Sequence, residues 1–214
     1  MDIKLKGKNI LITAGPTAVA IDKVRVISNI ASGETGILLA EKLISKGAQV
    51  TLLSGQADIC CINKKIRLIR FRFFDELKKA IEKELRNRKF DIIIHSAAVS
   101  DFRPVRVNKG KISSGIKSLN IKLVPAEKLV KIFKKTQPKV KLVIFKLELG
   151  VSANNLIKRA MAAKKEYKAD LVVANTFVKD KYRAFIIDSA GNIFGANNKN
   201  GLVKGLIKFL TYNS

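Results

Sequence analysis

The residues best suited to ligand chemistry lie in the stretch 12–36, ITAGPTAVAIDKVRVISNIASGETG. Two glycine turns, at Gly15 and at Ser32–Gly33, enclose a polar insert that carries Arg25 and Asn29. A glycine turn that opens a helix presents backbone N–H groups to an anion, and the helix dipole favours negative charge there. The dinucleotide fingerprint GxGxxG is absent from this stretch, and GxxxxGK[ST] is absent from the whole chain. The stretch therefore predicts a phosphate-bearing ligand held by a non-standard loop, with tight helix–sheet packing as the alternative role of the small residues.

Three further polar stretches each follow a run of apolar residues. They are Ser96–Asp101 (SAAVSD), Phe145–Glu148 (FKLE) and Asn175–Phe177 (NTF). In open α/β sheets, ligands bind beyond the carboxyl ends of the strands. We expect these stretches and the first loop to converge on one site.

The elements that must position these loops are short apolar, β-branched runs that alternate with helical patterns. The expected strands are Asn9–Ala14, Ala48–Leu53, Ile66–Phe71, Asp91–His95, Lys141–Phe145 and Asp170–Ala174. The expected helices are Gly36–Lys46, Asp75–Arg88, Ala126–Lys135, Asn154–Tyr167 and Asn200–Leu210. Strands that are apolar throughout, rather than alternating, are typical of parallel strands covered on both faces. The pattern predicts a doubly wound α/β fold in one domain, residues 1–214.

Two segments depart from this alternation. Asp101–Leu119 is a long basic loop rich in Gly and Ser, followed by an expected short strand at Asn120–Val124, and loops of that length are usually functional or disordered. Ala184–Ala196 has the pattern of a hairpin around a Ser-Ala-Gly-Asn turn. At the helix ends, Asp75 is expected as an N-cap and Gly47 as a C-terminal cap.

Composition restricts the class of protein. The chain has 214 residues, 47% of them hydrophobic, with a net charge of +25. No apolar run approaches the roughly 18 residues that span a bilayer. The two cysteines, Cys60 and Cys61, are adjacent, which suits neither a structural disulfide nor a metal site of usual spacing. We therefore expect a cytoplasmic protein with no membrane partner and no protein-bound metal site.

Two other functions remain open from the residues. The high charge suggests a basic nucleotide- or nucleic-acid-binding module, but the lysines are scattered and no aromatic-interleaved RNA-binding motif occurs, so we expect no specific nucleic-acid partner. HSAAVSD resembles the fourth-strand region of short-chain NAD(P)-dependent reductases, but no Tyr-x-x-x-Lys pair is present. His95, the only histidine, is expected to be a packing residue.

The motifs LITAGPT…D…VR.ISN.ASG..G and AAVSDFRPV…K together resemble those of the phosphopantothenoylcysteine synthetases, the phosphopantothenate–cysteine ligases of coenzyme A biosynthesis. The resemblance covers nearly the whole chain, including FKLE and ADLVVAN. It implies a Rossmann-like fold with a C-terminal hairpin and a flap loop, and a homodimer. It also implies that 4′-phosphopantothenate is activated by CTP or ATP with Mg²⁺ and that the amine of cysteine then displaces the nucleotide. In many members this domain follows a flavin-dependent decarboxylase, so a separate or fused decarboxylase is an expected partner.

The resemblance also implies roles for individual residues. Catalytic roles fall on Asn29, Lys111 and Arg25, and contacts with the phosphopantothenate fall on Asn29, Ala97 and Arg25. The residues implied to bind nucleotide are Gly15, Ser32, Gly33, Ala97, Ala98, Asp101, Lys111, Pro125, Ala126, Glu127, Phe145, Lys164 and Lys168. For Asn29 we expect the carboxamide N–H₂ to stabilise oxygen charge as cysteine attacks, and the alternative is a turn residue with positive φ.

This sequence departs from the family pattern at several positions. Glu34 replaces a lysine of the family's Ser-Ser-Gly-Lys-Met-Gly, and Thr176 replaces the aspartate of Ala-Asn-Asp. Residues 124–127 (VPAE) replace Asn-Pro-Asp-Ile, and residues 178–182 replace a glycine-rich stretch. These differences leave the choice of nucleotide open. The lysines of the flap, Lys109, Lys111 and Lys117, suit a loop that closes over phosphates, with a solvated loop as the alternative.

Overall fold

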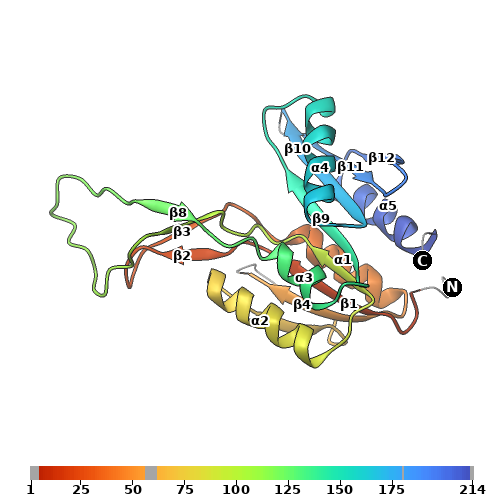
Figure 1. The fold of residues 1–214 in the computed structure, drawn as a ribbon, viewed down its shortest axis with the longest axis horizontal. Helices are drawn as coiled ribbons and strands as arrows, with labels where there is room; N and C mark the ends of the chain where they lie inside the picture. Colours follow the sequence, from red (N-terminus) through yellow and green to blue (C-terminus); the bar gives the residue numbers. More distant parts are fainter. Residues whose placement is uncertain (1–4, 56–61, 180, 213–214) are drawn as a thin grey trace.

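The fold, seen in a computed structural model that describes residues 5–55, 62–179 and 181–212, is built on an eight-stranded sheet (Figure 1). Its strands are β1 (Asn9–Ala14), β4 (Gln49–Ser54), β5 (Arg67–Arg70), β6 (Ile92–His95), β9 (Lys141–Leu147), β10 (Leu171–Val178), β11 (Lys181–Ile187) and β12 (Ile193–Ala196). They lie in the order β12-β11-β10-β9-β6-β1-β4-β5. Strands from β5 to β10 in this order run parallel, and β11 and β12 add an antiparallel hairpin edge. The predicted α/β class with a C-terminal hairpin is confirmed.

Helices cover both faces of the sheet. On one face lie α1 (Glu34–Ser45) and α5 (Lys199–Tyr212), and on the other lie α2 (Phe74–Asn87), α3 (Val130–Thr136) and α4 (Ala153–Glu166). Leu39 and Leu206 are fully buried in the first core, and Leu77 and Phe133 in the second. The parallel strands are apolar throughout because both of their faces are buried.

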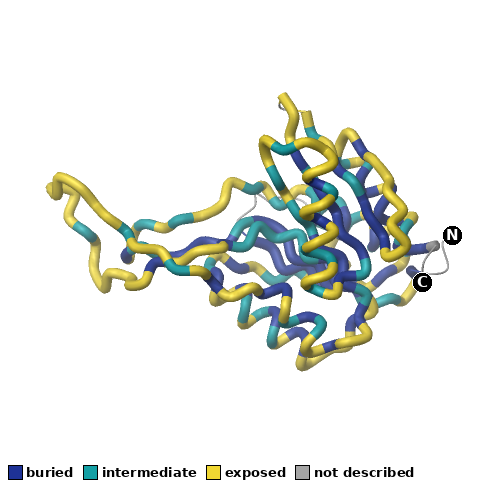
Figure 2. The backbone as a smooth tube through the Cα atoms, turned by 45° about the horizontal axis from the view of Figure 1, so that its top comes forward, coloured by how far each residue is buried: buried dark blue, intermediate teal, exposed yellow. Residues whose placement is uncertain are grey.

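A long arm projects from one side of the body (Figure 1). It consists of the hairpin pair β2 (Ala18–Ala20) and β3 (Val26–Ser28), and of β7 (Phe102–Pro104) and β8 (Leu123–Pro125) with the loop 105–122 between them. Figure 2 shows that most of the arm is exposed. The sequence analysis predicted the long loop and one strand near β8, but not the three-residue strands β2, β3 and β7, which are too short to carry a periodic pattern.

Helix ends give one confirmation and one correction. Gly47 follows α1 with a φ of +84°, as the predicted C-terminal cap requires. Asp75, predicted as an N-cap, lies inside the first turn of α2 instead, because Phe73 occupies the cap. The Glu76 carboxylate, at position N3, accepts from the N–H groups of Phe73 (3.0 Å) and Arg72 (2.7 Å), as the acidic residue of a capping box does. The expectations for Cys60 and Cys61 lie outside the described residues.

Candidate functional site

The loops that follow β1 and β6 are hydrogen-bonded to each other beyond the carboxyl edge of the sheet. Ala98 donates its N–H to the Gly15 carbonyl (2.9 Å), and Thr17 donates its N–H to the Ala98 carbonyl (3.2 Å). Ser100 donates its N–H to Thr17 Oγ1 (2.8 Å) and its hydroxyl to the Thr17 carbonyl (3.1 Å). The two loops predicted to converge are therefore one structural unit, and the structure brings Gly15 and Ala98 together.

Glycines let the start of α1 approach this unit closely. Gly15 (φ +80°) and Gly33 (φ +73°) have left-handed backbone, and a Cβ on Gly33 would lie 3.0 Å from the Gly15 nitrogen. A Cβ on Gly36 would lie 2.4 Å from the Ala14 Cβ, so Gly36 serves helix–sheet packing. The turn Ser32–Gly33 consequently lies directly against Gly15, at the same edge of the sheet.

Asn29 lies across the joined loops, with its side chain held by the main chain. Its Nδ2 donates to the carbonyls of Ala98 (3.0 Å) and Val99 (3.2 Å). These two bonds use both amide hydrogens, so the structure contradicts the expectation that the N–H₂ group is free to stabilise the reacting oxygen. The alternative of a positive-φ turn residue is also wrong, because the only described non-glycine residues with positive φ are Lys168 and Lys179. Asn29 is placed to position the loop after β6.

Asp22, a buried residue in the turn between β2 and β3, is the centre of a hydrogen-bond cluster within the arm. Its Oδ1 accepts from the N–H groups of Val24 and Arg25, both at 2.7 Å, and its Oδ2 accepts from the N–H of Ile112 (3.0 Å) and from Arg25 Nη1 (3.0 Å). The N–H groups of Ile112 and Val24 lower the pKa of Asp22 most, with the Arg25 N–H and charge adding to the effect, and together they bring it to about 2. Asp22 is 3% exposed and is therefore held as a carboxylate.

This cluster anchors the flap loop. Arg25 Nη1 also donates to the Ile112 carbonyl (3.1 Å), and the Asn108 N–H donates to the Ile21 carbonyl (2.9 Å). Lys111 lies between these anchor points and is exposed, with no ion pair among the described residues. Arg25, predicted to have a catalytic role and to contact the phosphopantothenate, uses its Nη1 to hold the flap. Sequence reasoning assigned no role to Asp22, because its contact with Ile112 joins residues 90 positions apart.

The residues expected around the nucleotide at the base of β8 lie together. The Asp101 carbonyl accepts from the Ala126 N–H (2.8 Å), and Phe102 pairs with Pro125 in the β7–β8 ladder. Two carboxylates here already carry lysine partners, Asp101 with Lys128 (2.5 Å) and Glu127 with Lys78 (2.5 Å). The hydrogen bond that Lys128 donates to Asp101 raises the pKa of Lys128. A ligand bound at this place would meet balanced charge.

Phe145 belongs to a second group, on the sheet face covered by α1 and α5. It pairs with Val173 across β9 and β10, so it shares this face with Asn175 and with Tyr182 on β11. Asn175 Oδ1 and Tyr182 OH are buried with no hydrogen-bond partner among the described residues, and Thr176 Oγ1 on the opposite face is in the same state. Burial raises the pKa of Tyr182. Sequence reasoning recognised Phe145 but gave no role to Tyr182.

Lys164 and Lys168, predicted as phosphate contacts, lie at the opposite edge of the sheet. Helix α4 runs antiparallel to the strands, so its C-terminal end returns to the start of β10. Next to that end, Asp170 donates its N–H to Leu142 O (2.8 Å) at the beginning of β9 and pairs with Lys134 (2.8 Å). The structure therefore separates these two lysines from Gly15, Gly33 and Ala98, and their assignment is corrected.

Glu34, which replaces a lysine of the family pattern, forms an ion pair with Lys199 at the start of α5. A cation is thus present at the beginning of α1, supplied by another element, although its charge is balanced by Glu34. The loss of positive charge inferred from the sequence is smaller than the substitution alone suggests.

His95 is placed as a packing residue. Thr13 Oγ1 accepts from the Ala97 N–H (3.3 Å) and forms a second hydrogen bond, of 2.8 Å, with His95 Nδ1. The ring of His95 meets Phe133 edge to face at 5.1 Å. Burial lowers the pKa of His95 to about 4, which leaves the imidazole neutral at physiological pH.

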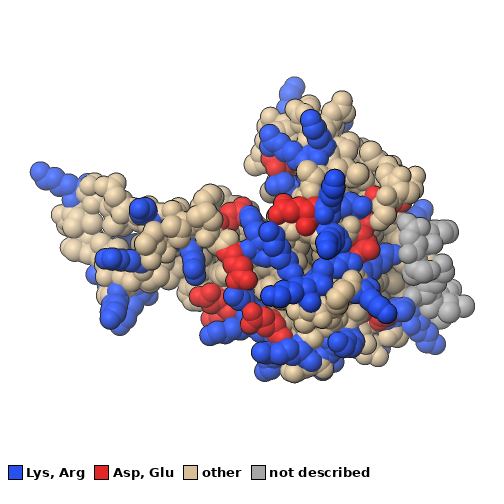
Figure 3. Space-filling model, viewed as in Figure 1, with Lys and Arg blue, Asp and Glu red and all other residues tan. Residues whose placement is uncertain are grey.

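Three further properties bear on the classes of ligand and partner that this protein could bind. Within the part of the chain that the structure describes, no three His, Cys, Asp or Glu side chains are grouped so that they could hold a metal ion. None of the described helices has both the length and the hydrophobicity needed to cross a bilayer. Figure 3 shows Lys and Arg side chains scattered over both the arm and the body.

Comparisons with known proteins agree with this architecture. Residues 5–208 match the family described as DNA/pantothenate metabolism flavoprotein C-terminal domain. The chain is 40% identical over 172 residues to the coenzyme A biosynthesis bifunctional protein CoaBC of Thermococcus kodakarensis, covering 80% of this chain and 42% of that protein. It spans about half the length of the curated relatives it matches.

Two solved structures show the same fold. The DNA/pantothenate metabolism flavoprotein of Streptococcus pneumoniae superposes with a TM-score of 0.87 at 24% identity, covering 97% of this chain and all of that one (100%). The C-terminal domain of a coenzyme A biosynthesis bifunctional protein CoaBC superposes with a TM-score of 0.79 at 25% identity, covering 97% of this chain and 96% of that one.

Proposed function

Because the chain belongs to the family of DNA/pantothenate metabolism flavoprotein C-terminal domains, we propose that it is a phosphopantothenate–cysteine ligase. The name of the Thermococcus relative, a coenzyme A biosynthesis protein, supports this assignment. In the proposed reaction, a carboxylate oxygen of 4′-phosphopantothenate attacks the α-phosphate of a nucleoside triphosphate and pyrophosphate leaves. The amine of cysteine then attacks the acyl carbon, loses a proton and displaces the nucleoside monophosphate, which forms the amide.

The observation that carries this proposal is that two loops are joined at the carboxyl edge and that the flap is fixed to the arm that projects from one of them. The loops after β1 and β6 are bonded to each other, and the lysine-bearing flap is fixed to the first of them through Asp22. Two phosphorylated substrates concentrate negative charge in one place, so a fixed loop that presents Lys111 supplies positive charge where it develops. We propose that Asn29 and Arg25 act by positioning the loops.

The proposed co-substrate is CTP, with Mg²⁺ carried by its phosphates. Mg²⁺ retains several waters and needs only one or two protein carboxylates beside the phosphates, so no three-ligand cluster is required of the chain. We propose that Phe145 contacts the base and that Asn175 and Tyr182, with their buried unpartnered oxygens, complete its surroundings.

With 4′-phosphopantothenate and cysteine present, we expect CTP to release pyrophosphate faster than ATP, GTP or UTP. The reason is that a smaller pyrimidine with an amino group offers a donor to the Asn175 oxygen. Pyrophosphate release with each triphosphate measures this, and omission of 4′-phosphopantothenate is the control. A clear preference for ATP would contradict the CTP assignment but leave the ligase assignment standing, whereas no pyrophosphate with any triphosphate would contradict both.

Neither alternative function has comparable support. The family match favours a ligase over a short-chain reductase. A nucleic-acid-binding module would need its cations gathered on one surface, whereas Figure 3 shows them dispersed.

We also propose that the arm joins two copies of this chain. Eight arm residues expose large apolar side chains, namely Val24, Val26, Phe102, Val105, Val107, Ile116, Leu119 and Leu123, and Ile30, just after β3, does so too. Such a group on a thin projection has no core of its own to enter, and a second copy would cover it.

A decarboxylase, fused or separate, is a further proposed partner because the chain spans 42% of its Thermococcus relative. We propose a cytoplasmic location for the whole protein.

Val107→Lys is expected to shift the protein from dimer to monomer in sedimentation equilibrium, because Val107 is 54% exposed on the arm and a lysine there would be buried unpaired. Leu149→Lys is the matched control, since Leu149 is 62% exposed on the body. A monomeric unmodified chain, or equal effects of both substitutions, would contradict an interface through the arm.

A further inference from the structure

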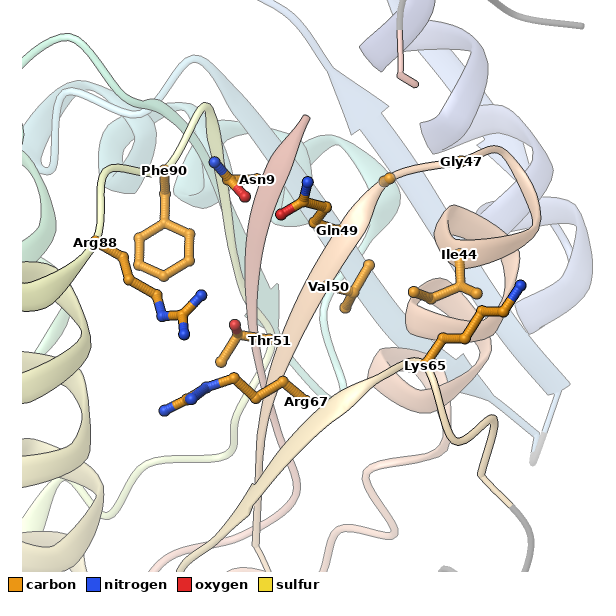
Figure 4. A pocket seen from close by; sticks show the side chains of 11 residues that line it. Asn9, Ile44, Gly47, Gln49, Val50, Thr51, Lys65, Arg67, Arg88 and Phe90 are labelled. Carbon is orange, nitrogen blue, oxygen red and sulfur yellow. The ribbon is translucent and has the colours of Figure 1, made fainter. Parts of the chain in front are cut away.

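A cavity of about 440 Å³ lies at the amino edge of the sheet, away from the loops described above. It is formed where β1, β4 and β5 begin and where α1 and α2 end. Figure 4 shows Arg88 and Phe90 on one side, Ile44 and Lys65 on the other, and strands β1 and β4 with Gln49 between them. Its volume is within the range of small-molecule sites.

The cavity is lined by cations and by no acidic side chain. Lys65, Arg67 and Arg88 contribute three positive charges to its wall. Glu84, which is 1% exposed, balances one of these charges, because its Oε1 accepts from Arg67 Nη2 (2.7 Å), whereas Asp91, which accepts from the Asn9 N–H (2.9 Å), is paired with Lys8. Arg88 Nε approaches Glu84 Oε2 only to 3.6 Å, too far for a hydrogen bond. One buried carboxylate thus fixes Arg67, and most guanidinium donors of Arg67 and Arg88 remain available.

The polar walls are held rigidly by buried contacts. Gln137, which is 6% exposed, accepts from the Phe90 N–H (3.0 Å) and donates to the carbonyls of Arg88 (2.6 Å) and Leu85 (3.0 Å). On the other side, the Lys65 N–H donates to Asn63 Oδ1 (3.0 Å). A wall that is already ordered loses little conformational entropy when a ligand binds.

The floor adds neutral hydrogen-bonding groups. Asn9 and Gln49 are paired across β1 and β4, and their side-chain amides make no hydrogen bond to the other described residues. Thr51 lies deeper, at 5% exposure. Guanidinium groups bind phosphate oxygens. Free side-chain amides bind hydroxyl groups, and an aromatic ring beside them contacts the carbon atoms that carry those hydroxyl groups.

We propose that this cavity is a second ligand site, which binds a small organic phosphate bearing hydroxyl groups. The phosphate lies against Arg67 and Arg88, and the hydroxyl groups meet Asn9 and Gln49. The site is independent of the proposed ligase function, because its residues belong to the opposite edge of the sheet from Gly15 and Ala98 and none belongs to the arm that carries Lys111.

The test is calorimetric titration of the full chain with ribose 5-phosphate, with ribose and inorganic phosphate as comparisons. We expect ribose 5-phosphate to bind more tightly than either comparison. Arg88→Gln should weaken its affinity about tenfold or more, since a charge-assisted contact is lost. The substitution leaves the Arg67–Glu84 hydrogen bond in place, and an unchanged melting temperature checks that the fold is intact.

Two matched variants locate the site. Lys89→Gln removes the same charge from the adjacent exposed residue, which does not line the cavity, and should leave the affinity unchanged. Lys111→Ala removes a cation from the arm and should also have no effect. Equal losses from Arg88→Gln and Lys89→Gln would show a general field effect, and a loss only in Lys111→Ala would place the ligand at the arm. Either of these results would overturn the proposal. Equal binding of ribose and ribose 5-phosphate would also overturn it, as would a site at which an oligonucleotide binds through Arg88 but ribose 5-phosphate does not bind.

Discussion

Lys111→Ala should lower the rate of pyrophosphate release by roughly 30- to 1000-fold, about 2–4 kcal/mol of barrier, with little change in nucleotide affinity. The reason is that Lys111 is exposed and unpaired among the described residues, yet the next residue, Ile112, is fixed by Asp22 and Arg25. A cation carried by an anchored backbone can meet charge that develops in the transition state without being reorganised first. Single-turnover rates and equilibrium binding of CTP measure the two quantities separately.

The control for this prediction is Lys117→Ala in the same loop. Lys117 is exposed and belongs to the part of the loop beyond the Asp22 anchor, so its removal should change the rate little. Equal losses from the two substitutions would favour a solvated loop whose lysines act only through their summed charge.

Asp22→Asn should lower the rate by about 100-fold, because a displacement of about 1 Å in a catalytic group can have that effect. The asparagine keeps the shape, but one of its two terminal atoms becomes an N–H₂ donor. If the N–H₂ group faces Ile112, two donors meet, because the Ile112 N–H no longer finds an oxygen that accepts its hydrogen bond. Arg25 also loses its charge partner. The flap would then detach from the β2–β3 turn while the sheet remains folded.

A double-mutant cycle separates anchoring from a general loss of stability. If Asp22 acts through Lys111, the combined variant Asp22→Asn with Lys111→Ala should be scarcely slower than Lys111→Ala alone. Asp75→Asn, an exposed carboxylate in the first turn of α2, is the matched control and should keep the full rate. Additive losses in the double variant would show that Asp22 does not position Lys111.

The pH dependence of the anchor follows from the same contacts. The pKa of Asp22 is lowered from its ordinary value of 3.8 to about 2, so its stabilising contribution is fully present above pH 4 and is lost as pH falls through 2. We therefore expect no titration of the anchor in rate profiles measured above pH 4.

The sequence alone was enough to establish the sheet and the edge at which the loops meet. Runs such as NILITA and IIIH are apolar on both faces, which only a parallel strand covered by helices on both sides satisfies. Once the strands are parallel, loops that follow them must share an edge, so Gly15 and Ala98 could be predicted to meet. The same rule, applied to the return of α4, would have excluded Lys164 and Lys168, because the C-terminal end of a crossover helix lies at the amino edge.

Only the tertiary structure decided what the polar side chains do. Asn29 was identified correctly as a residue of this edge, but its donors are taken by carbonyls 69 and 70 positions away. Asp22 had no visible partner in the sequence, because the hydrogen bond that gives it a role joins residues 90 positions apart. Strand formation depends on local apolar patterns that a sequence displays directly. A hydrogen bond depends on distance and direction between groups that folding brings together, and no local pattern records these.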